Sequence, residues 1–258
     1  MSDYENELYG KIAKVVYFVC RNPLIFVSET DIHTLMMKAL MEIKCIDPFK
    51  TTYKTKVTIG KNNRGKVSEN MYRTMLVHRE YGHRNKPRSR SDIVIFDEQD
   101  VESIDDPINL KNDKEYLTPK YIFEFGTDKS AGSDKVYKKH LEGDFEKLSE
   151  CKDHGRGFLI HIHRNYTRSG PGTGNFMNNE EKFKRYENIT AEVWNKWSKN
   201  KKLKVLVFFV QIGVPDYYTP SKIQMFNPYS TTDSGYWENV NLDEIENKIM
   251  ENLLKKWN

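Results

Sequence analysis

Apolar residues recur at helical spacing near the start of the chain and predict two amphipathic helices. Within residues 4–20, leucine, isoleucine and valine return every three or four positions, and Pro23 ends the pattern. Ser28 has the character of a helix N-cap, with Asp31 at the capping-box distance. The apolar stripe that follows consists of Ile32, Leu35, Met36, Ala39, Leu40 and Ile43. We expect this second helix to end before Asp47.

Apolar runs predict strands through the rest of the chain, separated by helical segments. The clearest strands are 91–96 and 120–125. Further segments are strands at 53–59, 71–81, 157–163 and 204–212, helices at 134–151, 180–199 and 242–257, and a cationic loop at 83–90. Because strands and helices alternate in the second half, we expect an α/β fold with a mixed central β-sheet flanked by helices. No linker or repeat divides the sequence, so residues 1–258 are expected to form one domain.

The two clearest strands each carry one carboxylate among apolar residues. Asp92 lies in the run Ser-Asp-Ile-Val-Ile-Phe, and Glu124 lies in the run Tyr-Ile-Phe-Glu-Phe. Burial of an ionised carboxylate is costly unless something pairs with it. A divalent cation, Mg²⁺ or Mn²⁺, is the simplest partner that two such acids on neighbouring strands could share. The sequence therefore predicts that Asp92 and Glu124 converge on a metal ion.

Charge is distributed unevenly along the chain, although the formal net charge is only +4. Residues 50–91 contain twelve Lys or Arg and two acids, whereas residues 92–128 contain eleven acids and three Lys. A basic block followed by an acidic one is expected where a polyanion-binding surface adjoins a cation site. Two solvated loops of opposite sign that attract each other would give the same pattern, and this alternative stays open.

Cysteine usage and the apolar runs indicate a soluble cytoplasmic protein. Cys20, Cys45 and Cys151 form no CxxC pair, which is typical of reduced thiols inside a cell. The acidic N-terminus does not have the pattern of a signal peptide. The apolar stretch at 12–27 is interrupted by Lys14 and by an Arg-Asn-Pro sequence, so we expect no membrane span.

Several segments follow one another in a characteristic order. They are a helix with Glu29, Arg-Glu-Tyr at 79–81, Arg-Ser-Asp-Ile-Val-Ile at 90–95, Ile-Phe-Glu-Phe at 122–125, and a helix with Asp-Phe-Glu-Lys-Leu at 144–148. Over about residues 28–165 this order resembles the PD-(D/E)XK nuclease superfamily, which includes restriction endonucleases. The resemblance implies a restriction-endonuclease-like core and Mg²⁺-dependent hydrolysis of DNA phosphodiester bonds. It further implies that Asp92 and Glu124 are metal ligands and that Glu29 is an assisting acid.

The chain departs from that family at one position. The family's lysine stands two residues after the glutamate, and here the position holds Gly126. Loss of such a cationic group typically lowers the rate on the order of a hundredfold or more. Lys147 on the following helix, or Lys129 just past Glu124, could supply the ammonium group instead. Alternatively, the fold is an inactive module that binds nucleic acid or a protein partner.

Basic residues close before Asp92 are expected to contact phosphates. They are Arg79, Arg84, Lys86, Arg88 and Arg90. The alternative is a solvated loop, or for Arg79 an ion pair across strands. DNA is the expected partner, RNA is the alternative, and a homodimer is a further option.

A pair of histidines, His161 and His163, shares one face of a predicted strand. A His-x-His pair can bind a transition metal. No cysteine or acid follows at ligand spacing, so we expect hydrogen-bonded histidines at the sheet surface.

Overall fold

The structure is a computed structural model. It describes residues 3–23, 25, 28–47, 53–59, 68–83, 86–102, 117–127, 133–151, 156–166, 179–197, 205–214, 222–226 and 237–254.

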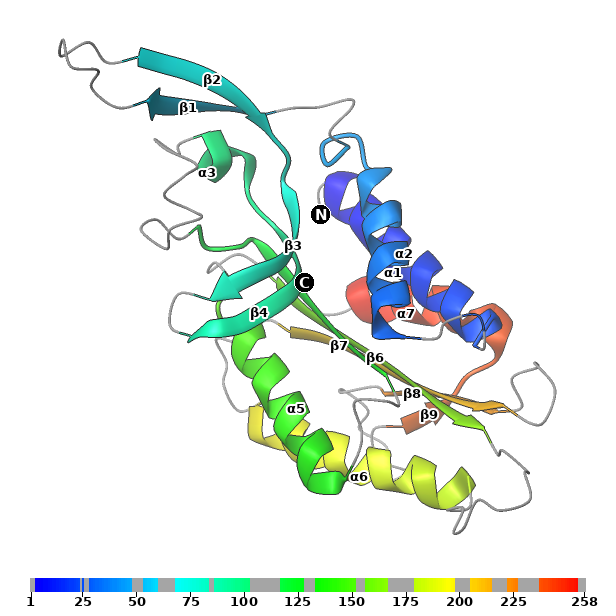
Figure 1. Cartoon of the computed structure of the whole chain (residues 1–258). Helices are drawn as coiled ribbons and strands as arrows, with labels where there is room; N and C mark the ends of the chain where they lie inside the picture. Colours follow the sequence, from blue (N-terminus) through cyan, green and yellow to red (C-terminus); the bar gives the residue numbers. More distant parts are fainter. Residues whose placement is uncertain are drawn as a thin grey trace.

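The described strands form one seven-stranded mixed β-sheet and one separate hairpin (Figure 1). The sheet order is β3-β4-β5-β6-β7-β8-β9, in which β5, β6 and β7 run parallel and the other neighbours antiparallel. The parallel centre arises because a helix connects each of these strands to the next. The bounds are β3 Val77–His83, β4 Lys86–Ile95, β5 Tyr121–Thr127, β6 Arg156–Tyr166, β7 Val205–Val214, β8 Lys222–Phe226 and β9 Trp237–Asn239.

The separate hairpin pairs β1 (Tyr53–Ile59) with β2 (Ser68–Thr74) in antiparallel register. It extends away from the rest of the molecule, next to β3 in the chain (Figure 1).

Helices cover both faces of the sheet (Figure 1). On one face lie α1 (Asp3–Arg21), α2 (Glu29–Met41) and α7 (Ile245–Leu254), and on the other lie α5 (Asp134–Leu148) and α6 (Asn179–Trp197). The short α3 (Glu98–Glu102) follows β4, and the 3₁₀ turn η2 (Leu242–Glu244) precedes α7. This arrangement confirms the predicted α/β fold with a mixed central sheet flanked by helices. In the part of the chain that the structure describes, no helix has the length and apolar character needed to cross a membrane.

Local sequence signals determine where α2 and α5 begin. The predicted capping box at Ser28 is present, with Asp31 Oδ2 accepting a hydrogen bond of 2.8 Å from the Ser28 backbone N–H. Ser133 caps α5, because its Oγ accepts a hydrogen bond from the Val136 backbone N–H. Such caps satisfy backbone donors that the first helical turn would otherwise leave without partners.

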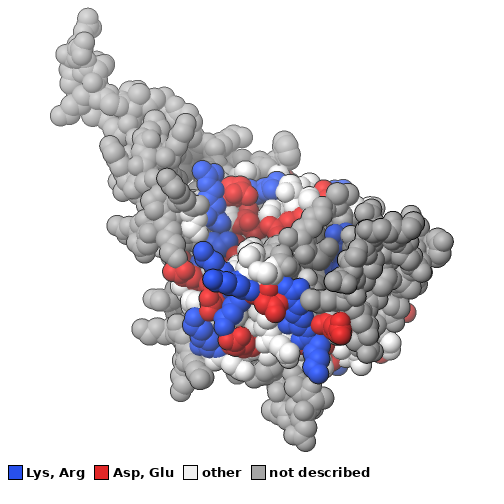
Figure 2. All heavy atoms as spheres, turned by 60° about the horizontal axis from the view of Figure 1, so that its bottom comes forward, with Lys and Arg blue, Asp and Glu red and all other residues white. Residues whose placement is uncertain are grey.

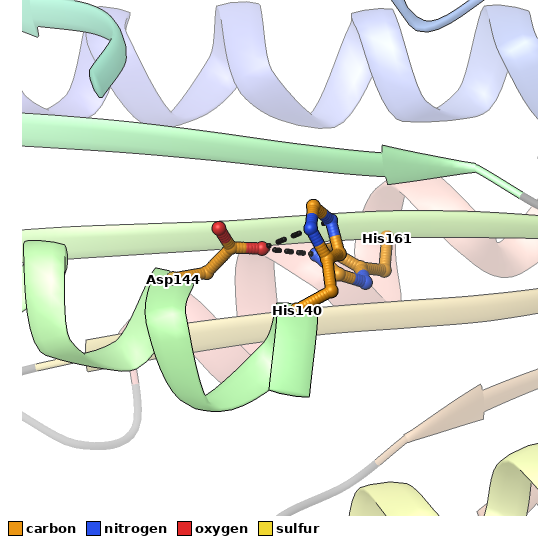
Figure 3. A group of neighbouring side chains, drawn as sticks. All are labelled: His140, Asp144 and His161. Carbon is orange, nitrogen blue, oxygen red and sulfur yellow. Dashed lines mark hydrogen bonds and ion pairs between the residues drawn. The ribbon is translucent and has the colours of Figure 1, made fainter. Parts of the chain in front are cut away.

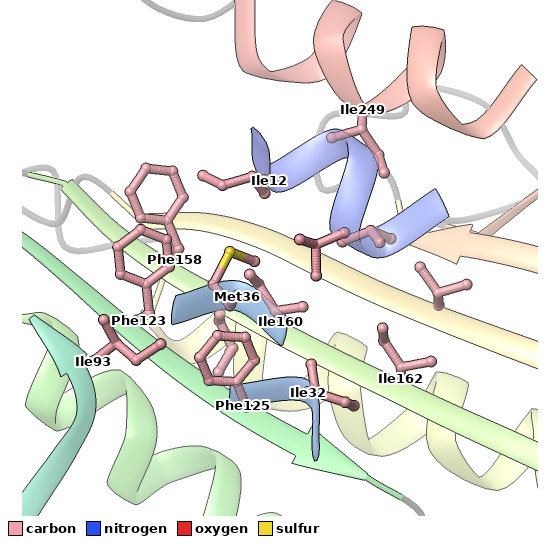
Figure 4. Close-up of a cluster of buried hydrophobic side chains, with 14 of the residues drawn as sticks. Ile12, Ile32, Met36, Ile93, Phe123, Phe125, Phe158, Ile160, Ile162 and Ile249 are labelled. Carbon is pink, nitrogen blue, oxygen red and sulfur yellow. The ribbon is translucent and has the colours of Figure 1, made fainter. Parts of the chain in front are cut away.

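The hydrophobic core covers both faces of the sheet, and Figure 4 shows part of the layer between the sheet and the α1, α2 and α7 helices. Ile12 from α1, Met36 from α2 and Ile249 from α7 are fully buried against the sheet. Phe123 and Phe158 stack across β5 and β6 with ring centroids 4.6 Å apart. The stretches predicted as strands at 91–96 and 120–125 therefore form the centre of this core, which fixes the positions of Asp92 and Glu124.

The predicted cationic loop at 83–90 is wrong over most of its length, because β4 already begins at Lys86. Alternating Lys or Arg with Pro or Ser resembles a solvated loop, but it is also compatible with a hairpin near the edge of a sheet, where charged side chains reach solvent. The segment 71–81 likewise divides into parts of β2 and β3 instead of forming one strand. Sequence reading missed β8 and β9, which are too short to show a clear period.

Candidate functional site

Asp92 and Glu124 lie next to each other at the point where β4 and β5 stop pairing. The antiparallel register runs from Ile95 opposite Tyr121 to Ile93 opposite Phe123. The next pair in this register would join Asp92 and Glu124. Instead, Asp92 Oδ2 accepts a hydrogen bond of 2.8 Å from the Phe125 backbone N–H. The carboxylate of Asp92 thus replaces a backbone partner and is held beside Glu124.

Burial raises the pKa of both carboxyl groups. It raises the pKa of Asp92 to about 7, although the charge of Lys147 and the hydrogen bond from Phe125 act in the opposite direction. The pKa of Glu124 is raised well above its usual range, first by burial and then by the charge of Asp92. A cation placed between such groups favours their ionised forms.

Lys147 of α5 contacts Glu124 directly. Its Nζ donates a short hydrogen bond to Glu124 Oε2, lies 3.0 Å from Asp144 Oδ1, and is 3.4 Å from the carbonyl oxygen of Arg90. Burial alone would lower the pKa of Lys147, but the charges of Glu124 and Asp144 outweigh burial and raise it. The other oxygen of Glu124, Oε1, is buried and has no hydrogen-bond partner among the residues that the structure describes. Glu124 therefore keeps one oxygen available for a further ligand.

Gly126 cannot be replaced by a lysine without moving a neighbour. A Cβ atom at this position would lie 2.5 to 2.7 Å from three ring atoms of His161. Contacts that short force a buried side chain to shift. The histidine ring thus occupies the space next to the position where the family's lysine would begin. Lys147 brings an ammonium group to Glu124 from the neighbouring helix.

The α2 helix contributes a second acid and a histidine near Asp92. His33 Nε2 lies 3.5 Å from Asp92 Oδ2 and 3.7 Å from Glu29 Oε1. One ligand-type atom from each of Glu29, His33 and Asp92 lies within 4.8 Å of the other two. Burial lowers the pKa of His33 to about 4, with smaller contributions from the charges of Arg79 and Lys147. A neutral imidazole can act as a metal ligand.

Sequence reading did not select His33. It stands one helical turn after Glu29, and this i, i+4 spacing was the available signal. However, His33 is surrounded by the apolar residues of the α2 stripe, so the pattern does not distinguish it from a core residue. Its ring also packs on Phe125, with centroids 4.8 Å apart.

The basic residues predicted to contact phosphates fall into two groups. Arg79 and Arg90 are exposed and border the acids: the charge of Arg79 acts on His33, and the carbonyl of Arg90 accepts a hydrogen bond from Lys147. Lys86 and Arg88 belong to β4, but their side chains lie outside the described part of the structure. Arg84 and the alternative Lys129 lie outside the described residues altogether.

Strand β3 is irregular beside Asp92. Arg79 pairs with Ile93 and Tyr81 pairs with Ser91, so Glu80 stands opposite Asp92. Glu80 has a φ of 53°, a conformation that residues other than glycine adopt infrequently. Asp92 is therefore flanked by an irregular residue on β3 and, on the other side, by the end of the pairing between β4 and β5.

The two histidines of β6 are hydrogen-bonded, as expected, but they are not at an exposed sheet surface. His161 and His163 are both fully buried, because α5 and α6 cover this face of the sheet. His161 Nε2 lies 3.2 Å from Asp144 Oδ2, and His163 Nε2 lies 3.0 Å from the Tyr137 hydroxyl. Burial lowers the pKa of both imidazoles.

Comparisons with known proteins identify no family. No protein-family model matches the chain, and no curated protein matches its sequence. A similar solved structure is that of the YaeQ protein from Xanthomonas axonopodis pv. citri. It is 10% identical, the match covers 73% of this chain and 97% of that chain, and the TM-score is 0.17. A superposition with that score does not establish a shared fold.

Proposed function

We propose that this protein is a metal-dependent nuclease that hydrolyses phosphodiester bonds in DNA. The observation that carries the proposal is the position of Asp92 and Glu124: a partly buried and a fully buried acid from neighbouring strands lie side by side where the strands separate. The motif order that resembles the PD-(D/E)XK superfamily supports the same assignment. The hydrogen bond from Lys147 to Glu124 Oε2 also supports the assignment, because Lys147 would supply the cationic group that is missing at Gly126.

The residues present fit a divalent cation. Glu124 Oε1 is a buried carboxylate oxygen to which no described residue donates a hydrogen bond, and Asp92 is an acid whose pKa is raised by burial. Hard oxygen donors of this kind suit Mg²⁺, and the nearby neutral imidazole of His33 would make Mn²⁺ an equally suitable ion. A bound ion supplies a lower pKa for coordinated water and stabilisation of the charge that develops on the phosphate. In this assignment Glu29 is close enough to assist Asp92 directly or through water.

Basic residues of the chain would hold the substrate and the metal-binding acids in place. Lys147 holds Glu124 and places an ammonium group beside the acids, where it can orient water or offset negative charge. Arg79 and Arg90, which are exposed next to the acids, would contact the phosphates.

The surface formed by α5 and α6 is less suited to a polyanion than the surroundings of Asp92. Figure 2 shows Lys and Arg interspersed with Asp and Glu among the described residues of the face that carries α5 and α6. Ion pairs between these helices account for part of this mixture, among them Lys196 with Glu142 at 2.8 Å and Lys138 with Glu192. Basic side chains that are already paired offer less to a phosphate, so the proposed DNA path follows Arg79 and Arg90.

A second candidate function is binding without cleavage. The specific observation in its favour is the Lys147–Glu124 contact, because a buried ion pair can also serve a structural role. This candidate requires nucleic-acid binding that weakens steeply with salt and needs no metal.

The deciding experiment is cleavage of supercoiled plasmid by the purified chain with Mg²⁺, with Mn²⁺ and with EDTA. We expect nicking with either metal, none with EDTA, and loss of nicking in both Asp92→Asn and Glu124→Gln. Asp97→Asn is the matched control, because Asp97 is an acid close after β4 that pairs with Lys120 at 3.2 Å. Circular dichroism of each variant would show that it is folded. Equal nicking by all variants would refute the assignment, and DNA binding with no nicking under any condition would favour the second candidate.

A further inference from the structure

A second group of ligand-type side chains lies beneath α5, away from Asp92. His140 Nε2 lies 3.3 Å and His161 Nε2 lies 3.2 Å from the same atom, Asp144 Oδ2 (Figure 3). One nitrogen from each histidine and this carboxylate oxygen all lie within 4.8 Å of one another. The group combines two imidazoles with one carboxylate, which is a donor set found in metal sites.

The backbone holds these side chains in place from two elements. His140 and Asp144 are one turn apart on α5 and therefore share a helix face. His161 points at them from β6, and it fits there because Gly126 on β5 has no side chain to fill the same space. Tyr137 packs at the edge of the group, 6.3 Å from His161 between ring centroids. The fold thus brings the three donors together.

Hydrogen bonding explains only part of this arrangement. His161 makes a hydrogen bond to Asp144, but the Nε2 atom of His140 is buried and, within the described part of the chain, makes no hydrogen bond in spite of its closeness to Oδ2. Donor atoms bound to Zn²⁺ at its usual distances in a tetrahedron stand about 3.3 Å apart. The distances to Asp144 Oδ2 match that spacing.

We propose that His140, Asp144 and His161 form a binding site for a divalent transition-metal ion of the Zn²⁺ type. The side chain of His140 is 32% exposed, so an ion can enter from that side and keep an open position for water. Asp144 Oδ1 contacts Lys147, which contacts Glu124, so Asp144 and Lys147 would separate the ion from Glu124. The site does not depend on nuclease activity.

The test is metal binding to the full chain, purified without a polyhistidine tag and stripped with a chelator. Co²⁺ is the first probe, because tetrahedral Co²⁺ with nitrogen ligands absorbs visible light strongly and Zn²⁺ then displaces it. We expect one strongly absorbing Co²⁺ per chain, and calorimetry with Zn²⁺ should show at least about a tenfold loss of affinity in His140→Ala. His78→Ala is the matched control, since it removes a half-buried histidine of β3 that bonds to the Met75 carbonyl.

Two further variants separate this site from the acids at Asp92. Asp92→Asn should leave the Co²⁺ spectrum unchanged, whereas His140→Gln, which keeps the side-chain size, should lose it as His140→Ala does. The proposal is overturned if the native chain binds neither Co²⁺ nor Zn²⁺ at millimolar concentration. It is also overturned if the His140 variants keep full affinity, or if Asp92→Asn loses the spectrum while the His140 variants retain it.

Discussion

The groups around Asp92 and around Asp144 differ in donor chemistry and in how the chain builds them. The first is rich in carboxylates and forms where two strands separate, with α2 contributing Glu29 and His33. The second is rich in imidazole and forms between a helix and a continuous strand. Carboxylate oxygens suit Mg²⁺ or Mn²⁺, whereas two imidazoles with one carboxylate suit Zn²⁺. The two proposed cation sites would thus differ in the ion they prefer, and the contact of Asp144 with Lys147 lies between them.

The largest expected effect comes from Lys147, which touches both groups. Lys147→Gln removes the ammonium group from Glu124 and from Asp144. We expect plasmid nicking to fall on the order of a hundredfold or more, because a preorganised charge beside the reacting phosphate is lost. Initial nicking rates with Mg²⁺ would measure this. Lys138→Gln is the control, as Lys138 belongs to the same helix but pairs with Glu192 of α6. If both variants nick equally fast, Lys147 has no part in the reaction.

Gly126 provides a stability test of the imidazole-rich group. Gly126→Ala would place a methyl group against the His161 ring, and we expect it to lower the free energy of unfolding by about 1–3 kcal/mol. Gly143→Ala on α5 is the control, because a Cβ there meets no atom within 4 Å and alanine favours a helix by roughly 0.5–1 kcal/mol. Urea denaturation of both variants measures the difference. A Gly126→Ala protein as stable as the native one would contradict the close approach of His161.

The carboxylate-rich group should make stability depend on pH. Because the pKa of Asp92 in the folded chain is about 7, above its unfolded value, the folded state binds more protons across this interval. Stability from this group therefore falls as pH rises from about 4 to about 7. His33, whose folded pKa is lowered to about 4, acts in the opposite direction over its own interval.

The difference between the native chain and Asp92→Asn isolates the contribution of Asp92. We expect the variant to gain stability relative to the native protein between pH 5 and pH 8, as measured by urea denaturation with EDTA present. Added Mg²⁺ should reduce that gain, since it stabilises the ionised acid of the native chain. A stability difference that stays constant with pH would show that Asp92 titrates normally.

The smallest expected effect concerns Arg79, an exposed residue next to the carboxylate-rich group, and its contribution to DNA binding. Arg79→Gln should weaken DNA binding for every sequence and lower the slope of log affinity against log salt by about 1. Lys196→Gln serves as the control, because Lys196 lies on α6 and pairs with Glu142. Fluorescence anisotropy over a range of salt concentrations gives both slopes. Identical slopes for Arg79→Gln and the native chain would place the DNA elsewhere.

Much of the fold follows from local patterns in the sequence. The capping box at Ser28 and the apolar stripe after it predicted where α2 begins, and the apolar runs around Asp92 and Glu124 predicted β4 and β5. The pairing of β3 with the first half of β4 was missed, because the alternation of charged residues with Pro and Ser before Asp92 is also typical of a solvated loop. The three residues of β9 are too few to show an alternation of apolar and polar positions.

The residues of the candidate sites could be predicted from the sequence only in part. Asp92 and Glu124 stood out because a lone acid in an apolar strand needs a partner, and that need can be read from one strand at a time. His33 does not stand out from its neighbours in the same way, since a histidine on a buried helix face is compatible with a core position. The contact of Asp144 with His161 joins a helix to a strand 17 residues later, so only the tertiary fold brings them together.

Asp144 and Lys147 are three residues apart on α5, and their side chains form an ion pair of 3.0 Å. A small slide or rotation of this helix against the sheet would change the surroundings of Glu124 and of His161 at the same moment. We therefore expect an ion that binds at Asp144 to change the position of Lys147 beside Glu124 as well.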